Sequence, residues 1–567
     1  MLLLAHGIVG RADLPIPESL FAAAAAIVLV VSFVALAFGW SRPRLAALPR
    51  RALARLPLAA EVVLGAVGVL AFVVSVYAGL AGTDTQSENL APTMVFVAFW
   101  VGVPFASLLF GNVWRLLSPW RAVGRVVGWF AKGVAGELPE PLAYPARLGR
   151  WPAAFWVFAF AVCELCWATA TEPRPLAILM IVYFVVMVVG MSVYGVEAWV
   201  TNADGFGVLF GLFGSLAPIG RREDGRLVLR VPGTGSLGAV TVAGMVAVLL
   251  TSVGSTAFDG AKEGALFNHM AQDLQSFFHS LGLSLGTGLE LGFVLVLLLS
   301  IAIVTTIWLA GMEGMPPAKE AHTRGARARA FGHALIPIAA GYLVAHYFSL
   351  LIYNGQDLWR LASDPLGNGS DLFGGANASI DYGVITATGI WYVQVGALVC
   401  GHVAALILAH DRALELYGSA RAATRSQVVM LMLMVAFTCL GLYLLSAALQ
   451  TQYPAGARRP LAAAAVLSGA GRGDGRRGRL GQAQGTPQKA LLTRFGRHPR
   501  GGWCPPMTGR WDELLVLWSA ARAEANLAYD DWCAHPGSDG YAVYRAAEDR
   551  ADAAEERLAL VASLQPV

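Results

Sequence analysis

The sequence of 567 residues predicts an all-α protein, a polytopic bundle of about ten transmembrane helices with its N-terminus outside the membrane. Three observations support this fold class. Hydrophobic residues make up 56% of the chain and charged residues only 14%, against roughly 25% charged residues in soluble domains. Apolar stretches long enough to cross a bilayer recur from residue 20 to residue 449. Arginine and lysine are concentrated in every second loop between these stretches.

The predicted spans are stretches in which a single helix satisfies every backbone N–H and C=O, as the bilayer interior requires. Each has about 20 mainly apolar residues, the length that crosses a hydrocarbon core of roughly 30 Å. They cover residues 20–40, 60–80, 92–113, 151–170, 175–200, 236–258, 287–312, 330–353, 384–410 and 427–449.

The charges of the loops predict the orientation of the spans. The first loop carries five arginines, whereas residues 82–90 carry Asp84 and Glu88 and no basic residue. The positive-inside rule therefore places the first loop inside the cell, and the loops after the third, fifth, seventh and ninth spans follow the same alternation. We expect a multi-pass protein of the plasma (inner) membrane whose main partner is the lipid bilayer. The small net charge of +4 gives no support for nucleic-acid binding.

Two loops are longer than a connection between helices needs. The inner segment 202–220 is rich in glycine and too short to span, so we expect it to be interfacial or re-entrant. The outer segment 354–382 is rich in Gly, Asp, Asn and Ser and reads as a loop or lid over the outer face.

The composition changes abruptly after the last span, which predicts three domains. Residues 1–452 form the transmembrane domain, residues 453–506 an Arg/Gly/Ala-rich disordered linker, and residues 507–567 a soluble helical hairpin. An even number of spans places this basic tail outside, against the bias of the earlier loops. We hypothesise that Met507 begins a separate small protein, joined through a frameshift, a sequencing error or a gene fusion.

A few polar residues inside the predicted spans are candidates for function, because burying an ionisable group in a bilayer costs about 2.5 to 3.5 kcal/mol. The candidates are Glu164, Glu197, His333, His346, His402 and His410. For His346 and His402, a hydrogen bond between helices is an equally good explanation. The Cys163–Cys166 pair has CxxC spacing, but inside a span the thiols are expected to behave as small hydrophobes.

A second group of polar residues belongs to the predicted outer face. It consists of His6, Asp259, His269, Asp273 and His279. Imidazole and carboxylate groups are ligands for Zn²⁺ and similar divalent metals, which activate bound water for hydrolysis. The candidate metal ligands are therefore His6, Asp259, His269, His346 and His402, and the candidate catalytic residues are His346, His402, His269 and Asp259. A motif such as HExxH, which would fix two ligands on one helix face, is missing from the sequence.

Six short stretches carry a resemblance to a known family, namely LAHG at 4–7, RADLP at 11–15, STAFDG at 255–260, WYVQ at 391–394, GHVA at 401–404 and AHDRA at 409–413. With these stretches, the chain resembles over about residues 1–450 the actinobacterial membrane proteins labelled fenitrothion hydrolase. The resemblance implies a hydrolase of phosphoric triester bonds that releases a nitrophenol from a small-molecule substrate. It assigns no catalytic residue.

The alternative to a hydrolase is a membrane permease, or a haem- or metal-binding subunit of a transport or redox complex. In that interpretation His346, His402, Glu164 and Glu197 line a polar path or bind haem, because they lie at successive depths. A third interpretation is a structural scaffold in which the histidines only join helices.

Overall fold

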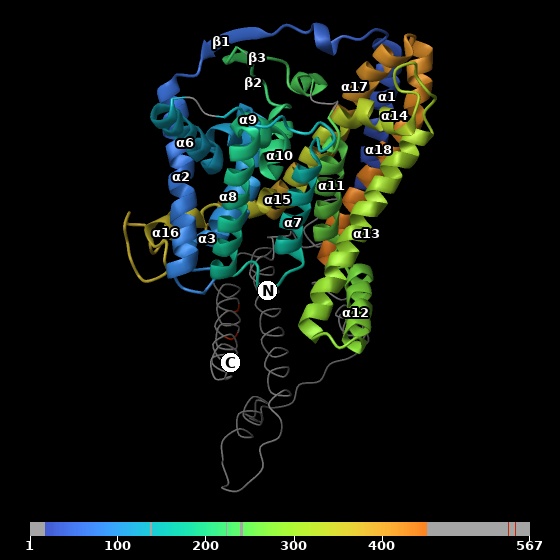
Figure 1. The fold of residues 1–567 in the computed structure, drawn as a ribbon. Coiled ribbons are helices and arrows are strands. Elements are labelled where there is room, and N and C mark those ends of the chain that lie inside the picture. The colour runs from blue at the N-terminus through green and yellow to red at the C-terminus, as the bar shows by residue number, and fades with distance from the viewer. Residues whose placement is uncertain are drawn as a thin grey trace, which may run out of the picture. The chain divides into compact units, whose positions relative to one another are not determined.

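Long apolar helices dominate the part of the chain that the computed structural model describes (Figure 1). The described residues are 18–136, 139–222, 224–238, 242–262 and 264–450, together with Val543 and Arg550. Seven helical segments among them are long and apolar enough to cross a membrane. These are α2 (Leu58–Ala81); α3 (Leu90–Thr93) with η3 (Met94–Gly102) and α4 (Val103–Phe110); α8 (Pro173–Tyr194); α13 (Leu285–Glu313); α14 (Arg324–Phe331) with η5 (Gly332–Ala334) and α15 (Leu335–Asn354); α17 (Ala387–Tyr417); and α18 (Ala420–Gln450).

The other three predicted spans correspond to the shorter apolar helices α7 (Trp151–Leu165) and α11 (Met245–Ala261) and to α1 (Glu18–Gly39), whose apolar part is Ala23–Gly39. The boundaries predicted for two of them were wrong. The segment 236–258 does not start as a helix at its first residue, because η4 (Thr234–Gly238) is a short 3₁₀ turn and α11 begins only after Gly244. Gly244 has a φ of 82°, a conformation that glycine adopts without strain. The segment 151–170 stops being helical at Leu165 and continues as turns.

The centre of the bundle is α15, which is buried along almost its whole length. It packs closely against α17, where Gly341 and Gly401 face each other across the two helices. A Cβ at Gly341 would lie 2.8 Å from the Ala397 carbonyl oxygen, and one at Gly401 would lie 2.6 Å from the Pro337 carbonyl oxygen. Small residues let backbones approach in this way inside a membrane, where packing rather than hydrophobicity joins the helices. The residues of α15 are thereby fixed between α11 and α17.

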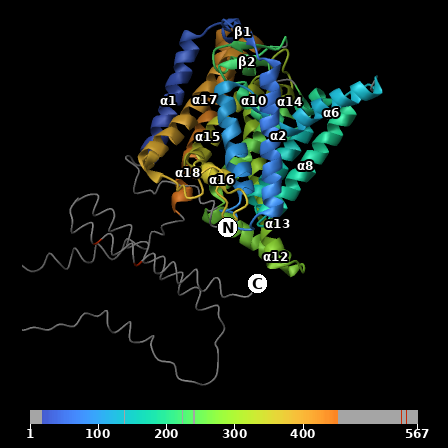
Figure 2. The same ribbon diagram turned by 90° about the vertical axis from the view of Figure 1, so that its left-hand side faces the viewer.

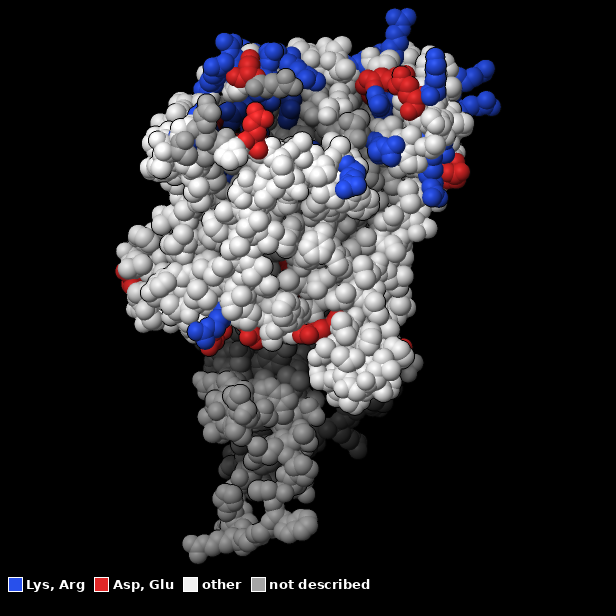
Figure 3. All heavy atoms as spheres, in the orientation of Figure 1, with Lys and Arg blue, Asp and Glu red and all other residues white. Residues whose placement is uncertain are grey.

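A three-stranded antiparallel sheet, which the sequence did not predict, lies at one end of the bundle (Figure 1). Its order is β1 (Arg51–Arg55), β3 (Arg226–Leu229) and β2 (Ile219–Arg221). On the face drawn in Figure 3, lysine and arginine gather at this end together with some acidic residues, whereas the charged residues at the other end are mainly acidic. We call these the basic end and the acidic end.

The Gly-rich segment 202–220 contains α10 (Gly205–Gly214), a short helix whose residues are mostly buried. Its first turn is capped by Asp204, whose Oδ1 accepts a hydrogen bond from the backbone N–H of Phe206 at 3.1 Å. The segment is therefore an internal helix in the structure. The remaining short elements are η2 (Leu45–Ala47), α5 (Trp114–Leu117), α6 (Pro119–Ala135), α9 (Val196–Asn202), α12 (Ala265–Ser280), α16 (Asp357–Ser363) and η6 (Tyr382–Val384).

The segment 354–382 packs against the loop between α2 and α3 at the acidic end. The backbone N–H of Thr83 donates to the Leu366 carbonyl oxygen at 2.8 Å, and Arg360 Nη2 donates to the Ser87 carbonyl oxygen at 2.6 Å. The predicted linker and helical hairpin of residues 453–567 lie outside the described residues, apart from Val543 and Arg550.

Candidate functional site

Four polar side chains from α11 and α15 meet near the acidic end of the bundle. Asp259 Oδ2 accepts hydrogen bonds from His346 Nε2 at 2.8 Å and from the Tyr347 hydroxyl at 2.9 Å. Asp259 Oδ1 pairs with Lys262 Nζ at 3.0 Å. We call these four residues, Asp259, Lys262, His346 and Tyr347, the Asp259 cluster.

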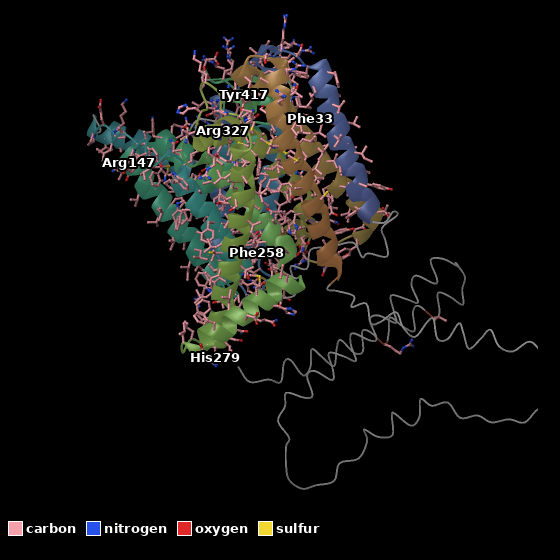
Figure 4. The ribbon with its side chains drawn as sticks, turned by 90° about the vertical axis from the view of Figure 1, so that its right-hand side faces the viewer. Phe33, Arg147, Phe258, His279, Arg327 and Tyr417 are labelled. Atoms are coloured by element: carbon pink, nitrogen blue, oxygen red, sulfur yellow. The ribbon has the colours of Figure 1, made fainter. Side chains whose placement is uncertain are left out.

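The local sequence explains how the Asp259 cluster forms. Asp259 and Lys262 are three residues apart, so the end of α11 brings them to one side of the helix. His346 and Tyr347 are consecutive in α15, and their rings lie 4.6 Å apart at 88°. Figure 4 shows Phe258, the neighbour of Asp259, inside the bundle.

The Asp259 cluster is largely shielded from its surroundings. The side chains of Asp259 and His346 are 2% and 11% exposed, and that of Lys262 is 22% exposed. A buried carboxylate requires compensating donors, and here it has a cation, an imidazole and a phenol. Since an ionised carboxylate only accepts hydrogen bonds, the proton shared with His346 belongs to Nε2, and Nδ1 carries the ring's lone pair.

Glu164 of α7 adds a second carboxylate beside this cluster. It interacts electrostatically with both Asp259 and Lys262. Two carboxylates, one ammonium and one imidazole therefore share a single low-dielectric region. Cys163 and Cys166, on either side of Glu164, are free thiols. Cys163 lies in the last turns of α7 and is partly buried, and Cys166 is the buried residue that follows its end; no disulfide joins them.

The structure brings together two of the predicted candidates and separates a third from them. Asp259 and His346 are in direct contact. His269 is an exposed residue of α12, and Figure 4 shows His279 at the far tip of that helix. Within the described part of the chain, no three His, Cys, Asp or Glu side chains converge so as to hold a metal ion. His6 lies outside the described residues.

His402 belongs to a different group of residues, between α15 and α17. Its ring is fully buried and lies 6.1 Å from that of Tyr342, and its Nδ1 donates to the Leu398 carbonyl oxygen at 2.8 Å. The second ring nitrogen, Nε2, has no hydrogen-bond partner among the described residues. His333 follows the same pattern, with Nε2 bonded to the Leu408 carbonyl oxygen at 3.3 Å and Nδ1 without such a partner.

His410 and Asp411 hold the end of α1 to α17 at the basic end. His410 Nε2 donates to the Trp40 carbonyl oxygen at 3.0 Å, and Trp40 Nε1 donates to Asp411 Oδ1 at 3.0 Å. The backbone N–H of Arg44 donates to the same oxygen at 2.7 Å. These contacts join two helices, and α17 continues past the predicted end of the span at residue 410 as far as Tyr417.

Glu197 lies outside the long helix that corresponds to the predicted span 175–200. It lies in α9, after α8 has ended at Tyr194, and pairs with Arg121 at 2.6 Å and Arg115 at 3.0 Å. The predicted end of this span was therefore too late, and the role of Glu197 in a polar path stays a prediction. Glu197 follows closely after the apolar residues of α8, so the sequence did not show where α8 ends and α9 begins.

Three polar residues escaped the sequence analysis. Lys262 was read only as a loop charge, although its position three residues after Asp259 suggested a helical pair. Tyr347 adjoins His346 but resembles any aromatic core residue. Asp204 accepts hydrogen bonds from Trp120 Nε1 and from the Tyr183 hydroxyl, both at 2.8 Å, and no local sequence pattern indicates these contacts between distant segments.

Comparison of the chain with models of protein families, with curated proteins and with solved structures finds no match. The resemblance to the fenitrothion hydrolase group therefore stays a prediction, and function has to be argued from the site.

Proposed function

We propose that this integral membrane protein is a hydrolase of small uncharged esters, with His346 as the general base and Asp259 as its positioning residue. The observation that supports the proposal is the single buried carboxylate that binds an imidazole, a phenol and an ammonium at once. A carboxylate that fixes the tautomer and orientation of a histidine is the arrangement by which hydrolases activate a nucleophile.

The proposed chemistry is the attack of water on a phosphorus or acyl centre. His346 Nδ1 takes a proton from water as the oxygen bonds to phosphorus, and the bond from phosphorus to the leaving oxygen breaks. The imidazolium, stabilised by Asp259, then returns the proton to the leaving alkoxide or aryloxide. Lys262 offsets the negative charge that develops on the phosphoryl oxygen, an effect that is strong in a low-dielectric site.

The proposed substrate class is a phosphotriester-like molecule. A neutral triester enters an apolar site without the desolvation cost of a charged phosphate. The resemblance over residues 1–450 suggests the same class, because the stretch STAFDG at 255–260 contains Asp259.

A divalent metal would change this mechanism, and the Asp259 cluster is the place for it. Asp259 and His346 are the two candidate ligands that lie together, and both would have to give up the hydrogen bond that joins Oδ2 and Nε2 at 2.8 Å, with water completing the coordination of the ion. A bound ion would supply a hydroxide at neutral pH. The full chain, purified in lipid nanodiscs, is therefore assayed for zinc, manganese and iron before and after chelation.

We further propose about ten spans, with α1, α7 and α11 crossing the membrane alongside the seven longer segments, and with the N-terminus outside. The gathering of basic residues at the end that carries the sheet supports this orientation (Figure 3). The Asp259 cluster then lies toward the outer side of the plasma membrane. The orientation is tested with cysteine substitutions at Ser280 and Arg421. An impermeant thiol reagent is applied to intact cells, and the proposed orientation requires that the cysteine at 280 is labelled and the cysteine at 421 is not.

The proposed activity is tested by nitrophenol release from an uncharged nitrophenyl phosphotriester. His346→Ala is expected to abolish release by the full chain in nanodiscs. His279→Ala is the matched control, because His279 is an exposed histidine at the tip of α12. Equal rates in wild type and His346→Ala would refute the role of His346.

The second candidate function is a haem-binding or permease subunit, and His402 and His333 favour it. Each buried imidazole donates one nitrogen to a carbonyl and has no partner for the other among the described residues. A histidine held in this way suits an axial haem ligand or a proton relay. A Soret band that His402→Ala removes would support the haem form, and its absence together with no substrate uptake into vesicles would count against this candidate.

We also propose that residues 507–567 are a helical hairpin that originated as a separate protein beginning at Met507. The change of composition after residue 453 supports it. The intact mass of the protein from its native host tests it, since a fused chain has the mass of all 567 residues and a frameshift artefact does not.

A further inference from the structure

An apolar cavity of about 410 Å³ lies among α2, η3, α7, α8 and α10, outside the Asp259 cluster. Its size is within the range of pockets that bind small organic molecules, which is roughly 300–1,000 Å³. It is lined on one side by Ala71 of α2 and on another by Ala159 and Cys163 of α7. Neither the proposed hydrolysis nor the histidines of α15 and α17 uses this space.

The cavity exists because α2 and α8 touch closely at one end, are joined further along by the stacked rings of Phe72 and Phe184 with centroids 5.2 Å apart, and separate beyond that contact. At the acidic end Gly79 is so close to α8 that a Cβ would lie 2.5 Å from the Pro173 carbonyl oxygen and 2.7 Å from Ala177 Cβ. Figure 2 shows α8 leaning away from α2 toward the basic end. Val67 and Val182 line the cavity and are also 51% and 50% exposed, so the cavity opens on the lipid-facing surface between α2 and α8.

The polar atoms of the cavity wall are nearly all used by the protein itself. Ser75 Oγ donates to the Ala71 carbonyl oxygen at 2.7 Å, and Tyr183 and Trp120 both donate to Asp204. A charged or strongly polar ligand would therefore lose its hydration without compensation. The ligand that fits these walls is uncharged.

Aromatic rings dominate the walls and favour an aromatic ligand over an alkyl chain. The rings come from separate elements and meet edge to face, with Phe99 and Phe206 at 4.7 Å and 75°, and Phe160 and Phe206 at 5.3 Å and 89°. Edges and faces of this kind attract a further ring in an offset or perpendicular position, by about 0.5 to 1.5 kcal/mol a pair beyond its burial.

We propose that this cavity binds an uncharged, aryl-bearing molecule that enters sideways from the lipid between α2 and α8. Phe160 lines the cavity, and its ring lies 4.5 Å from that of Trp100, which is beside Tyr347 of the Asp259 cluster. These two rings form the partition between the cavity and the cluster. The assignment of the bound molecule as the substrate of His346 rests on the proposed function, whereas the binding itself does not.

The experiment uses photolabelling of the full chain in nanodiscs with 3-trifluoromethyl-3-phenyldiazirine, a neutral aryl carbene precursor. Mass spectrometry compares the peptide that contains Phe160 and Cys163 with a lipid-facing peptide around Leu295 and Leu298 of α13. We expect labelling of the first peptide to saturate and to be reduced by naphthalene but not by dodecane at the same mole fraction. Labelling of the second is expected to rise in proportion to the probe.

Cavity-filling variants provide the control. Ala71→Trp is expected to abolish the saturable labelling, and Ala66→Trp, on the exposed side of the same helix, to leave it unchanged. Ala159→Trp fills the cavity from α7 and replaces Ala71→Trp if the latter fails to fold. Labelling that never saturates in the wild type would overturn the site, and equal competition by dodecane would overturn the aromatic class. Photolabelling of the Asp259→Asn variant separates binding from hydrolysis. We expect this variant to keep the saturable labelling of the cavity although it cleaves no ester.

Discussion

Replacement of Asp259 by asparagine is the most informative perturbation of the Asp259 cluster. The amide keeps the shape of the side chain and one acceptor oxygen. It loses the negative charge that compensates Lys262 and one of the two oxygens that hold Lys262, His346 and Tyr347 at 2.8 to 3.0 Å. Its NH₂ group, a donor, then faces groups that are themselves donors.

The expected loss in the free energy of unfolding follows from the burial of the ion pair between Asp259 and Lys262. Removing one partner of a buried ion pair costs about 3–5 kcal/mol, because the other charge is left uncompensated. Lys262 is 22% exposed and keeps part of its hydration, and it also interacts with Glu164, so the lower end of that range applies. We expect a loss of about 3 kcal/mol in the free energy of unfolding, which is about a hundredfold in the ratio of folded to unfolded protein.

The assay is reversible unfolding in mixed micelles, followed by tryptophan fluorescence as the fraction of dodecyl sulfate rises. Asp273→Asn is the control, because Asp273 is an exposed carboxylate on α12. A loss in Asp259→Asn that is no larger than in Asp273→Asn, or under about 0.5 kcal/mol, would refute the reasoning that the carboxylate compensates a buried cation.

Three further predictions concern other parts of the fold. Asp204→Asn is expected to lower the midpoint of thermal unfolding by an amount equivalent to about 1–3 kcal/mol, since a fully buried cap loses its charge. Gly68→Ala is expected to abolish monodisperse expression, because its Cβ would lie 1.7 Å from a backbone oxygen, whereas Gly128→Ala meets nothing within 4 Å and is expected to express normally. The Ser363 hydroxyl holds the pKa of Asp371 below its usual value, so the ionised form is favoured in the folded loop. The stability this contributes is present above the unfolded pKa of about 3.9 and is lost as the pH falls through the lower folded value. The protection of the backbone amides of residues 354–382, measured as the exchange rate relative to the intrinsic rate at the same pH, should therefore fall on acidification, but not in Asp371→Asn.

The helical class and the positions of the apolar segments could be predicted from the sequence because the bilayer imposes a length and a composition on each helix. The small sheet could not be predicted. The segment Arg51–Arg55 does not alternate polar and apolar residues and stands in an arginine-rich loop, and its partner Arg226–Leu229 is far away in the chain. Whether two strands so far apart in the sequence pair depends on how the helices between them pack.

Only part of the candidate site could be predicted, because it also depends on how helices far apart in the sequence pack together. The sequence placed Asp259, His269 and His346 on one side of the membrane but gave no distances between helices. The packing of α11 against α15 joins Asp259 to His346, and the amphipathic α12 leaves His269 on its exposed face. Lys262 and Tyr347 complete the Asp259 cluster only once both helices have been placed.

The most direct test of the proposed function is chemical rescue. The full chain in nanodiscs is incubated with an uncharged nitrophenyl phosphotriester, and nitrophenol release is followed for wild type and for His346→Ala with and without added imidazole. The proposal predicts release by wild type, none by His346→Ala, and partial recovery with imidazole. Release by His346→Ala at the wild-type rate, or no release by wild type, would contradict it.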